Sequence, residues 1–218
     1  MSENADSQNK FRNEIARKIL HMCSFLIVIF IYFVDKKTAC IVIGALLVLL
    51  FAANTLLLSS RFQIINDFKV KYFSFLLRDD EKHGYISSNW FLLGCFLSVL
   101  LFPKYVAMLG ITVLIFGDAF AAIIGVRFGK HKFKNGKSLE GTLGFIVVSY
   151  LFLTAFMLLL PDAGISFAVA SFIAIPIVAV AEIYSKQIKI DDNLVIPIVF
   201  GVLTVVLMKI FEMSGLFV

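Results

Sequence analysis

The sequence has few charged residues and few cysteines. Asp, Glu, Lys and Arg make up only 16% of its 218 residues, whereas 60% are apolar and the mean hydropathy is +0.94. This composition excludes a water-soluble globular domain and indicates a polytopic membrane protein. Cys23, Cys40 and Cys95 lie in apolar surroundings without a C-x-x-C spacing, so neither a disulfide framework nor a zinc site is predicted.

The sequence also lacks the marks of a removable leader and of a second domain. The polar stretch 1–18 precedes an apolar run that ends at Asp35 and has no small-residue cleavage site, so we expect an anchor and not a signal peptide. There is no internal repeat, low-complexity tract or flexible linker. We therefore predict a single integral membrane domain over residues 1–218.

Long apolar runs are abundant. A transmembrane helix needs about 20 mainly apolar residues, and seven segments approach or meet that length: 19–34, 39–58, 86–102, 105–128, 141–160, 165–184 and 194–211. We predict an all-α transmembrane helix bundle of about seven spans. In a further stretch, 62–77, aromatic and aliphatic residues recur at helical spacing opposite polar ones, which predicts one amphipathic helix in the membrane interface.

The basic residues are distributed unevenly between the two ends of these spans. Seven alternating crossings place 16 of the 20 Lys and Arg residues on the side of the N-terminus. By the positive-inside rule, the N-terminal segment 1–18 and the basic, glycine-containing loop 129–140 are cytoplasmic. We expect the active site on this cytoplasmic face, in the plasma membrane if the protein is prokaryotic.

Two acids within or beside the spans are functional candidates, because charges in a membrane are costly. They are Asp118 in the fourth span and Glu182 near the inner end of the sixth. Asp118 lies nine residues before Arg127, which is roughly 14 Å along an unbroken helix. Either a water-filled crevice reaches this acid, or the span is broken near Gly117. The four-residue spacing of small residues from Gly117 to Gly125 is also typical of close helix packing.

The loop after the fourth span combines basic residues, glycines and hydroxyl groups. Such a loop can form a cradle for phosphates, because glycine allows close approach and exposed amides bind anions. Gly136, Lys137 and Ser138 match the end of a phosphate-binding P-loop, but His131 occupies the upstream glycine position and no strand precedes it, so we reject that interpretation. An ordinary positive-inside turn is the alternative.

Two further polar clusters lie at the same membrane face. The segment 191–193 reads Asp-Asp-Asn; it supplies oxygen ligands that suit magnesium, or it is a turn that caps the seventh span. Glu14, Arg17, Lys18 and His21 share one face of a helix. They either line the cytoplasmic mouth of a site or anchor the helix in the interface.

The stretch 117–142 resembles the central motif of the CTP-dependent lipid-alcohol kinases, a family that comprises dolichol kinase, phytol kinase and the CTP-using diacylglycerol kinase. Supporting similarities lie in the N-terminal Glu-Arg-Lys-His cluster, in 78–84, at Glu182, in 191–193 and at Pro197, so the resemblance covers nearly the whole chain. In its shortness the chain resembles the minimal prokaryotic members.

The resemblance implies a set of site residues. The basic pair of the family falls on Arg17 and Lys18, and its acid on Asp118, and we expect these three residues to be catalytic. The residues expected to bind the nucleotide are Gly125, Arg127, Gly129, Lys130, Gly136, Lys137, Ser138, Glu140, Gly141, Thr142 and His21. The expected ligands of Mg²⁺ or a similar divalent cation are Asp118, Glu182, Asp191 and Asp192.

The activity implied by the resemblance is transfer of the terminal phosphate of CTP to the hydroxyl of a polyprenol, a phytol-like alcohol or diacylglycerol. Asp118 would hold magnesium or accept the proton of the alcohol. The expected partners are this lipid alcohol, the nucleoside triphosphate and membrane lipids, with no nucleic acid. A cytidylyltransferase that makes a CDP-lipid, and a transporter of an anionic lipid or solute, are the alternatives.

Overall fold

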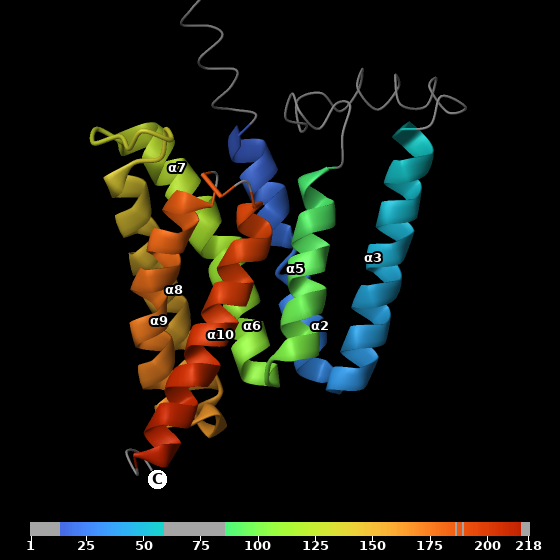
Figure 1. Cartoon of the computed structure of the whole chain (residues 1–218), viewed down its shortest axis with the longest axis vertical. Coiled ribbons are helices and arrows are strands. Elements are labelled where there is room, and N and C mark those ends of the chain that lie inside the picture. The colour runs from blue at the N-terminus through green and yellow to red at the C-terminus, as the bar shows by residue number, and fades with distance from the viewer. Residues whose placement is uncertain (1–13, 59–85, 186, 189, 215–218) are drawn as a thin grey trace, which may run out of the picture.

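The computed structural model describes residues 14–58, 86–185, 187–188 and 190–214, which form a bundle of helices (Figure 1). Residues 14–23, here called the N-terminal helix, lead through a short turn into α2 (Leu26–Phe33). The other helices of the described residues are α3 (Lys36–Leu58), α5 (Ser87–Leu101), α6 (Lys104–Thr112), α7 (Asp118–Phe128), α8 (Leu139–Leu159), α9 (Ile165–Tyr184) and α10 (Asp192–Met213).

The helices confirm the predicted all-α transmembrane bundle. Six helical segments are long and apolar enough to span a membrane: Glu14–Phe33, Lys36–Leu56, Lys104–Phe128, Leu139–Leu159, Ile165–Tyr184 and Asp192–Met213. The remaining predicted span corresponds to α5, which has only 15 residues. The predicted interfacial helix, 62–77, and the similarity at 78–84 lie outside the described residues.

Several helices begin before the apolar runs from which the spans were predicted. α3, α6 and α10 start at Lys36, Lys104 and Asp192, and each of these residues belongs to the first helical turn. An apolar run marks only the part of a helix that lies in hydrocarbon, so polar residues at the membrane interface extend the helix beyond it.

The segment Lys104–Phe128 is at the centre of the bundle, and α3 is at its edge. In the most apolar window of each helix, 56% of the residues of Lys104–Phe128 are buried inside the protein, against 22% for Lys36–Leu56. Leu109, Ile111 and Leu114 are fully buried, and α6 packs against α2, α5, α8 and α10. The peripheral α3 packs mainly on α5, where Asn54 Nδ2 donates to Asn89 Oδ1 at 2.6 Å.

The central helix changes its winding directly before Asp118. Residues Val113–Gly117 form a π-helical turn between α6 and α7. A π-turn holds one residue more than an α-turn and is frequent at functional sites. The helix is therefore widened near Gly117 and not interrupted. The π-turn also sets the direction in which the Asp118 side chain and the following residues of α7 point.

Glycines bring α7 and α8 into close contact. A Cβ atom on Gly117 would lie 2.8 Å from a ring carbon of Phe145, and one on Gly141 would lie 2.6 Å from the carbonyl oxygen of Ala121. A Cβ on Gly125 would lie 3.0 Å from Ser138 Oγ. These distances leave little or no room for a side chain, so the small residues pack the two helices that carry the central motif.

Candidate active site

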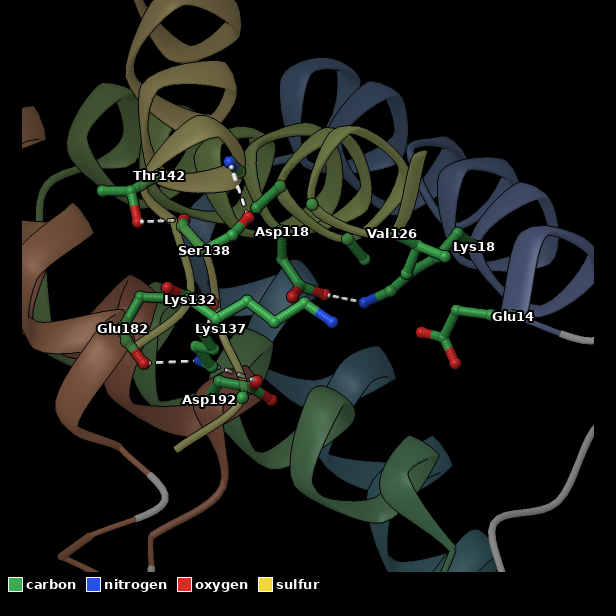
Figure 2. Close-up of a pocket in the computed structure, with 15 residues that line it drawn as sticks. Glu14, Lys18, Asp118, Val126, Lys132, Lys137, Ser138, Thr142, Glu182 and Asp192 are labelled. Atoms are coloured by element: carbon green, nitrogen blue, oxygen red, sulfur yellow. Dashed lines mark hydrogen bonds and ion pairs between the residues drawn. The ribbon is translucent and has the colours of Figure 1, made fainter. Parts of the chain in front are cut away.

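A cavity of about 290 Å³ lies at the end of the bundle where α7 ends and α8 and α10 begin (Figure 2). In Figure 1 this end also carries the start of the N-terminal helix, whereas α10 ends at the opposite end of the bundle. The residues that line the cavity are Glu14, Lys18, Asp118, Ala121, Ala122, Gly125, Val126, Lys132, Gly136, Lys137, Ser138, Gly141, Thr142, Glu182 and Asp192.

Asp118 is the deep acid of the cavity. It is the first residue of α7 and only 6% exposed. Its carboxylate forms an ion pair with the Lys18 ammonium group, which comes from the N-terminal helix and is also 6% exposed. The sequence allowed either a crevice that reaches Asp118 or a break in the span near Gly117. The structure has a cavity that reaches Asp118, and the helix continues past Gly117 without a break.

Lys137 connects the basic loop to α9 and α10. Its Nζ atom lies 2.5 Å from Glu182 Oε1 and 3.7 Å from Asp192 Oδ2, and it also donates to the Glu182 carbonyl oxygen at 2.5 Å. Asn135 Nδ2 holds the tip of the loop by donating to the carbonyl oxygen of Ile183 at 2.5 Å. The loop is therefore fixed against the C-terminal end of α9 through two side chains.

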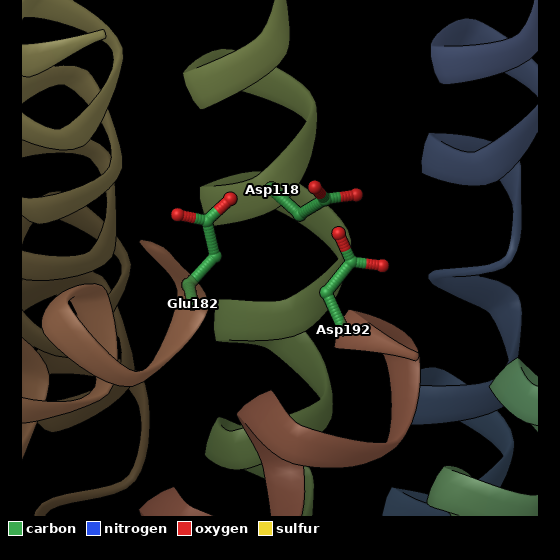
Figure 3. Close-up of side chains that lie close together, drawn as sticks. All are labelled: Asp118, Glu182 and Asp192. Carbon is green, nitrogen blue, oxygen red and sulfur yellow. The ribbon is translucent and has the colours of Figure 1, made fainter. Parts of the chain in front are cut away.

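Three carboxylates from three different helices meet in the cavity (Figure 3). Asp118 begins α7, Glu182 lies in the last turn of α9, and Asp192 begins α10. One oxygen of each lies within 4.8 Å of the others. Like charges this close repel one another unless cations neutralise them, and Lys18 and Lys137 supply two of the neutralising charges.

The basic loop has a defined backbone. Gly136 adopts a φ of 85°, which is a region that favours glycine, at the turn that precedes Lys137. Ser138 caps α8, because its Oγ accepts a hydrogen bond from the Gly141 amide at 3.1 Å. On the outer side of the loop His131 Nδ1 lies 2.7 Å from Glu140 Oε1. The start of α8 is thereby set at the edge of the cavity.

The structure brings together many, but not all, of the residues predicted for the site. Ten of them line the cavity: Lys18, Asp118, Gly125, Gly136, Lys137, Ser138, Gly141, Thr142, Glu182 and Asp192. The other predicted residues do not line it: Arg17, His21, Arg127, Gly129, Lys130, Glu140 and Asp191.

Several of the residues outside the cavity have structural contacts. Arg17 Nη2 pairs with both oxygens of Glu14 on its own helix, at 2.7 and 2.6 Å. Asp191 caps α10 by accepting from the Asn193 amide at 3.0 Å, which is the capping alternative considered for this turn. The ring of His21 packs edge-on against Phe91, with the two ring centres 4.9 Å apart.

Lys132 was not among the residues predicted for the site. This lysine lines the cavity, and in Figure 2 its side chain extends across the space between Asp118 and Asp192. Its backbone pairs with that of Ser138 across the loop, which turns the side chain inward. Lys130, Lys132 and Lys134 are spaced by two, so strand-like alternation would place all three on one side of the loop, and the sequence carried no signal that selects Lys132.

The fold and this site define a class of protein: a multi-pass membrane protein whose polar cavity, lined by lysines and carboxylates, opens at one end of the bundle.

An uncharacterized protein of Rickettsia prowazekii is 31% identical over 202 residues, which are 90% of this chain and 95% of the relative. The phytol kinase of Synechocystis sp. is 28% identical over 195 residues, 85% of this chain and 76% of that enzyme. The CTP-dependent diacylglycerol kinase 1 of Schizosaccharomyces pombe is 29% identical over 143 residues, 61% of this chain and 65% of that enzyme.

The chain belongs to the lipid kinase family that includes CTP-dependent diacylglycerol kinases, dolichol kinases and phytol kinase. This finding confirms the resemblance seen in 117–142. No family model matches the chain. No solved structure matches it.

Proposed function

We propose that the protein is a CTP-dependent kinase that transfers the terminal phosphate of CTP to the hydroxyl group of a membrane lipid alcohol. The observation that carries the proposal is the convergence of Asp118, Glu182 and Asp192 with three lysines in one cavity of a membrane-spanning bundle. Acids that hold a metal ion and bases that hold phosphates are the groups that phosphoryl transfer requires. Relatives named as CTP-dependent diacylglycerol kinase, dolichol kinase and phytol kinase support CTP as the phosphate donor and a lipid alcohol as the acceptor.

The carboxylate cluster fits a magnesium ion. Magnesium prefers carboxylate oxygens and keeps several water molecules, and it usually joins one or two protein carboxylates to nucleotide phosphates. Asp118, Glu182 and Asp192 offer such oxygens within 4.8 Å of one another, from three different helices. These three residues would hold the ion, which when bound neutralises phosphate charge.

The basic loop and the start of α8 would bind the phosphates. Lys132 extends into the cavity, and no ion pair is found for it among the described residues. Lys137 lies at the other wall of the cavity, close to Glu182. Gly141 and Thr142 lie in the first turn of α8, where the helix dipole favours negative charge. Phosphates bound here would lie next to the carboxylate cluster.

The acceptor would enter along α7. Ala121, Ala122 and Val126 form an apolar wall of the cavity, and Val126 is 56% exposed at its outer edge. Asp118 and Ala122 are one turn apart on the same face of α7. A lipid alcohol whose chain lies in the membrane could therefore bring its hydroxyl to Asp118, which would hold the metal or accept the hydroxyl proton.

The cavity would face the cytoplasm. It lies at the end of the bundle that carries the N-terminal helix and the basic loop, and the excess of lysine and arginine at this end supports a cytoplasmic position. Soluble nucleotides would then reach the site directly. We propose the plasma membrane as its location if the protein is prokaryotic.

The decisive experiment is incubation of the purified protein with γ-labelled CTP, Mg²⁺ and a panel of polyprenol, phytol and diacylglycerol. We expect label in a lipid product together with release of CDP, and no label with the Asp118→Asn variant. Parallel assays with ATP and GTP measure the nucleotide preference. Pyrophosphate and a CDP-lipid would instead identify a cytidylyltransferase, and no transfer to any acceptor from any nucleotide would contradict kinase activity.

A further inference from the structure

A buried lysine, Lys18, and a partly buried one, Lys137, contact the same carboxylates that would hold the metal ion. Lys18 pairs with Asp118, and Lys137 lies 2.5 Å from Glu182 and 3.7 Å from Asp192. All three acids of the cluster are therefore in contact with an ammonium group. Lys132, by contrast, lines the same cavity but has no such pair among the described residues.

An ammonium group and a divalent cation compete for these oxygen atoms. The side chain of Lys18 is 8% exposed and that of Lys137 is 14% exposed, so water screens their charges only weakly. A divalent cation among the three carboxylates would lie next to both ammonium groups, and repulsion between the cations would weaken metal binding. A bound metal would therefore weaken the two ion pairs, just as the ion pairs would weaken metal binding.

Both lysines can move without unfolding the site. A lysine carries its charge on a flexible four-carbon stem, and both side chains already border the cavity in which Lys132 lies (Figure 2). A change of rotamer would turn an ammonium group from the cavity wall toward its centre, and in Lys137 it would also release the hydrogen bond to the Glu182 carbonyl oxygen. The centre is where the proposed function places the nucleotide phosphates.

We propose that Lys18 and Lys137 are internal counter-ions, which a divalent cation displaces from the carboxylates and which then bind the phosphates of the nucleotide. Phosphate binding by the two lysines rests on the proposed function, whereas their displacement by a divalent cation does not. Metal alone binds weakly, because it must separate two ion pairs. Metal and nucleotide together bind tightly, because the phosphates receive the displaced charges, so each ligand increases the affinity for the other by the same factor.

The test measures Mn²⁺ binding to the purified full-length protein in detergent, without nucleotide, by electron paramagnetic resonance. Replacing Lys137 by Met keeps the length of the side chain and removes its charge. We expect the Kd for Mn²⁺ to fall about tenfold in each of the single variants Lys137→Met and Lys18→Met, since removing a nearby cation favours binding of the divalent ion. In Lys137→Arg, which keeps the charge, the Kd should not fall.

Lys134→Met is the matched control. Lys134 belongs to the same loop and is exposed outside the cavity, so this variant makes the same change in net charge. Its Kd for Mn²⁺ should stay within about twofold of the wild type, because an exposed charge is screened by solvent. A Kd that is unchanged or higher in both Lys137→Met and Lys18→Met, compared with this control, would overturn the proposal.

A second measurement uses the wild-type protein, in case the variants do not fold. Mild acetylation followed by mass spectrometry reports how accessible Lys137 is relative to Lys134. Adding Mn²⁺ should raise the acetylation of Lys137, since the ion frees its ammonium group from Glu182. An unchanged ratio would contradict displacement, even if the protein transfers phosphate from CTP. If the protein proved not to be a kinase, the Mn²⁺ measurements would still decide whether the lysines are displaced.

Discussion

Lysines stand at both ends of the bundle, but they contact different kinds of group. At the cavity end, Lys18 and Lys137 pair with side-chain carboxylates, including that of Asp118. At the opposite end, Lys104 Nζ donates to the backbone carbonyl oxygens of Tyr32 and Val34, at 2.8 and 2.9 Å. The carboxylates of the first pairs are the metal ligands that we propose, whereas the hydrogen bonds of Lys104 satisfy carbonyl groups at the end of a helix.

The difference shows that the positive charge of a lysine does not by itself indicate its role, which depends on the group that the lysine contacts. Lys36 likewise donates to the carbonyl oxygen of Phe102 at 3.0 Å, which closes the end of α5. These lysines at the far end stabilise helix ends whose carbonyl groups have no partner within the helix. We expect the lysines of the cavity to change activity and those of the far end to change only stability.

The largest expected effect is that of Asp118→Asn. We expect phosphate transfer to fall by about 10³-fold or more, which is the size of loss that follows removal of a preorganised charge contact with the transition state. The variant also leaves the Lys18 ammonium buried without its partner, which should lower the free energy of unfolding by about 3 kcal/mol. Initial rates with γ-labelled CTP and thermal unfolding in detergent measure the two effects.

A double variant separates these two effects. Asp118→Asn combined with Lys18→Met removes both charges, so the stability lost in the single variant should largely return. Activity should not return, because the carboxylate is still absent and the ammonium group that we propose to bind phosphate is lost as well. Recovery of transfer in the double variant would mean that Asp118 serves only to neutralise Lys18.

The next expected effect distinguishes the other two acids of the cavity. Glu182 is 5% exposed, whereas Asp192 is partly exposed and lies farther from Lys137. We expect Glu182→Gln to raise the Mg²⁺ concentration for half-maximal transfer by at least about tenfold, a range typical of losses at metal sites. Asp192→Asn should raise this concentration less, because water can more readily replace a ligand that is partly exposed. Equal, negligible effects would exclude the cluster as the metal site.

Much of the fold could be predicted from the sequence, because a membrane restricts the chain strongly. A span must be helical and long enough to cross the hydrocarbon layer, and the apolar runs located every α-helix that the structure describes between residues 14 and 214, though not the short 3-10 helix Pro161–Ala163. The π-helical turn Val113–Gly117 could not be predicted. Its position depends on how α6 and α8 pack around it, which a pattern of apolar residues does not record.

The site could be predicted in part, because its acids are costly in a membrane and therefore conspicuous. Asp118 and Glu182 were found in this way. The meeting of Glu182 with Lys137 could not be predicted, because it depends on how the loop folds back onto α9 through Asn135. Lys132 was not expected for the same reason, since a chain of alternating basic residues does not show which ones face inward.

A smaller effect is expected from Lys132→Met. This side chain is exposed and extends into the cavity, so its loss should raise the KM for CTP by about tenfold, a usual value for one charge-assisted contact with phosphate. The free energy of unfolding of the variant should be unchanged, because the substitution removes no ion pair within the described residues. The same substitution at Lys134, outside the cavity, is the control, and an equal rise in KM there would attribute the effect to the overall charge of the loop.

The smallest effect on activity is expected at the far end of the bundle. Lys104→Met removes the hydrogen bonds to Tyr32 and Val34, and bonds that involve a charged group contribute about 1.5–3 kcal/mol to stability. The melting temperature should therefore fall while kcat and KM for CTP stay at wild-type values, because the substitution lies at the end of the bundle opposite the cavity. Lys37→Met, at an exposed position in the first turn of α3, controls for loss of charge at this membrane face. If Lys104→Met slowed transfer while Lys37→Met did not, the two ends of the bundle would be coupled, and the division between lysines that act on ligands and lysines that close helix ends would be wrong.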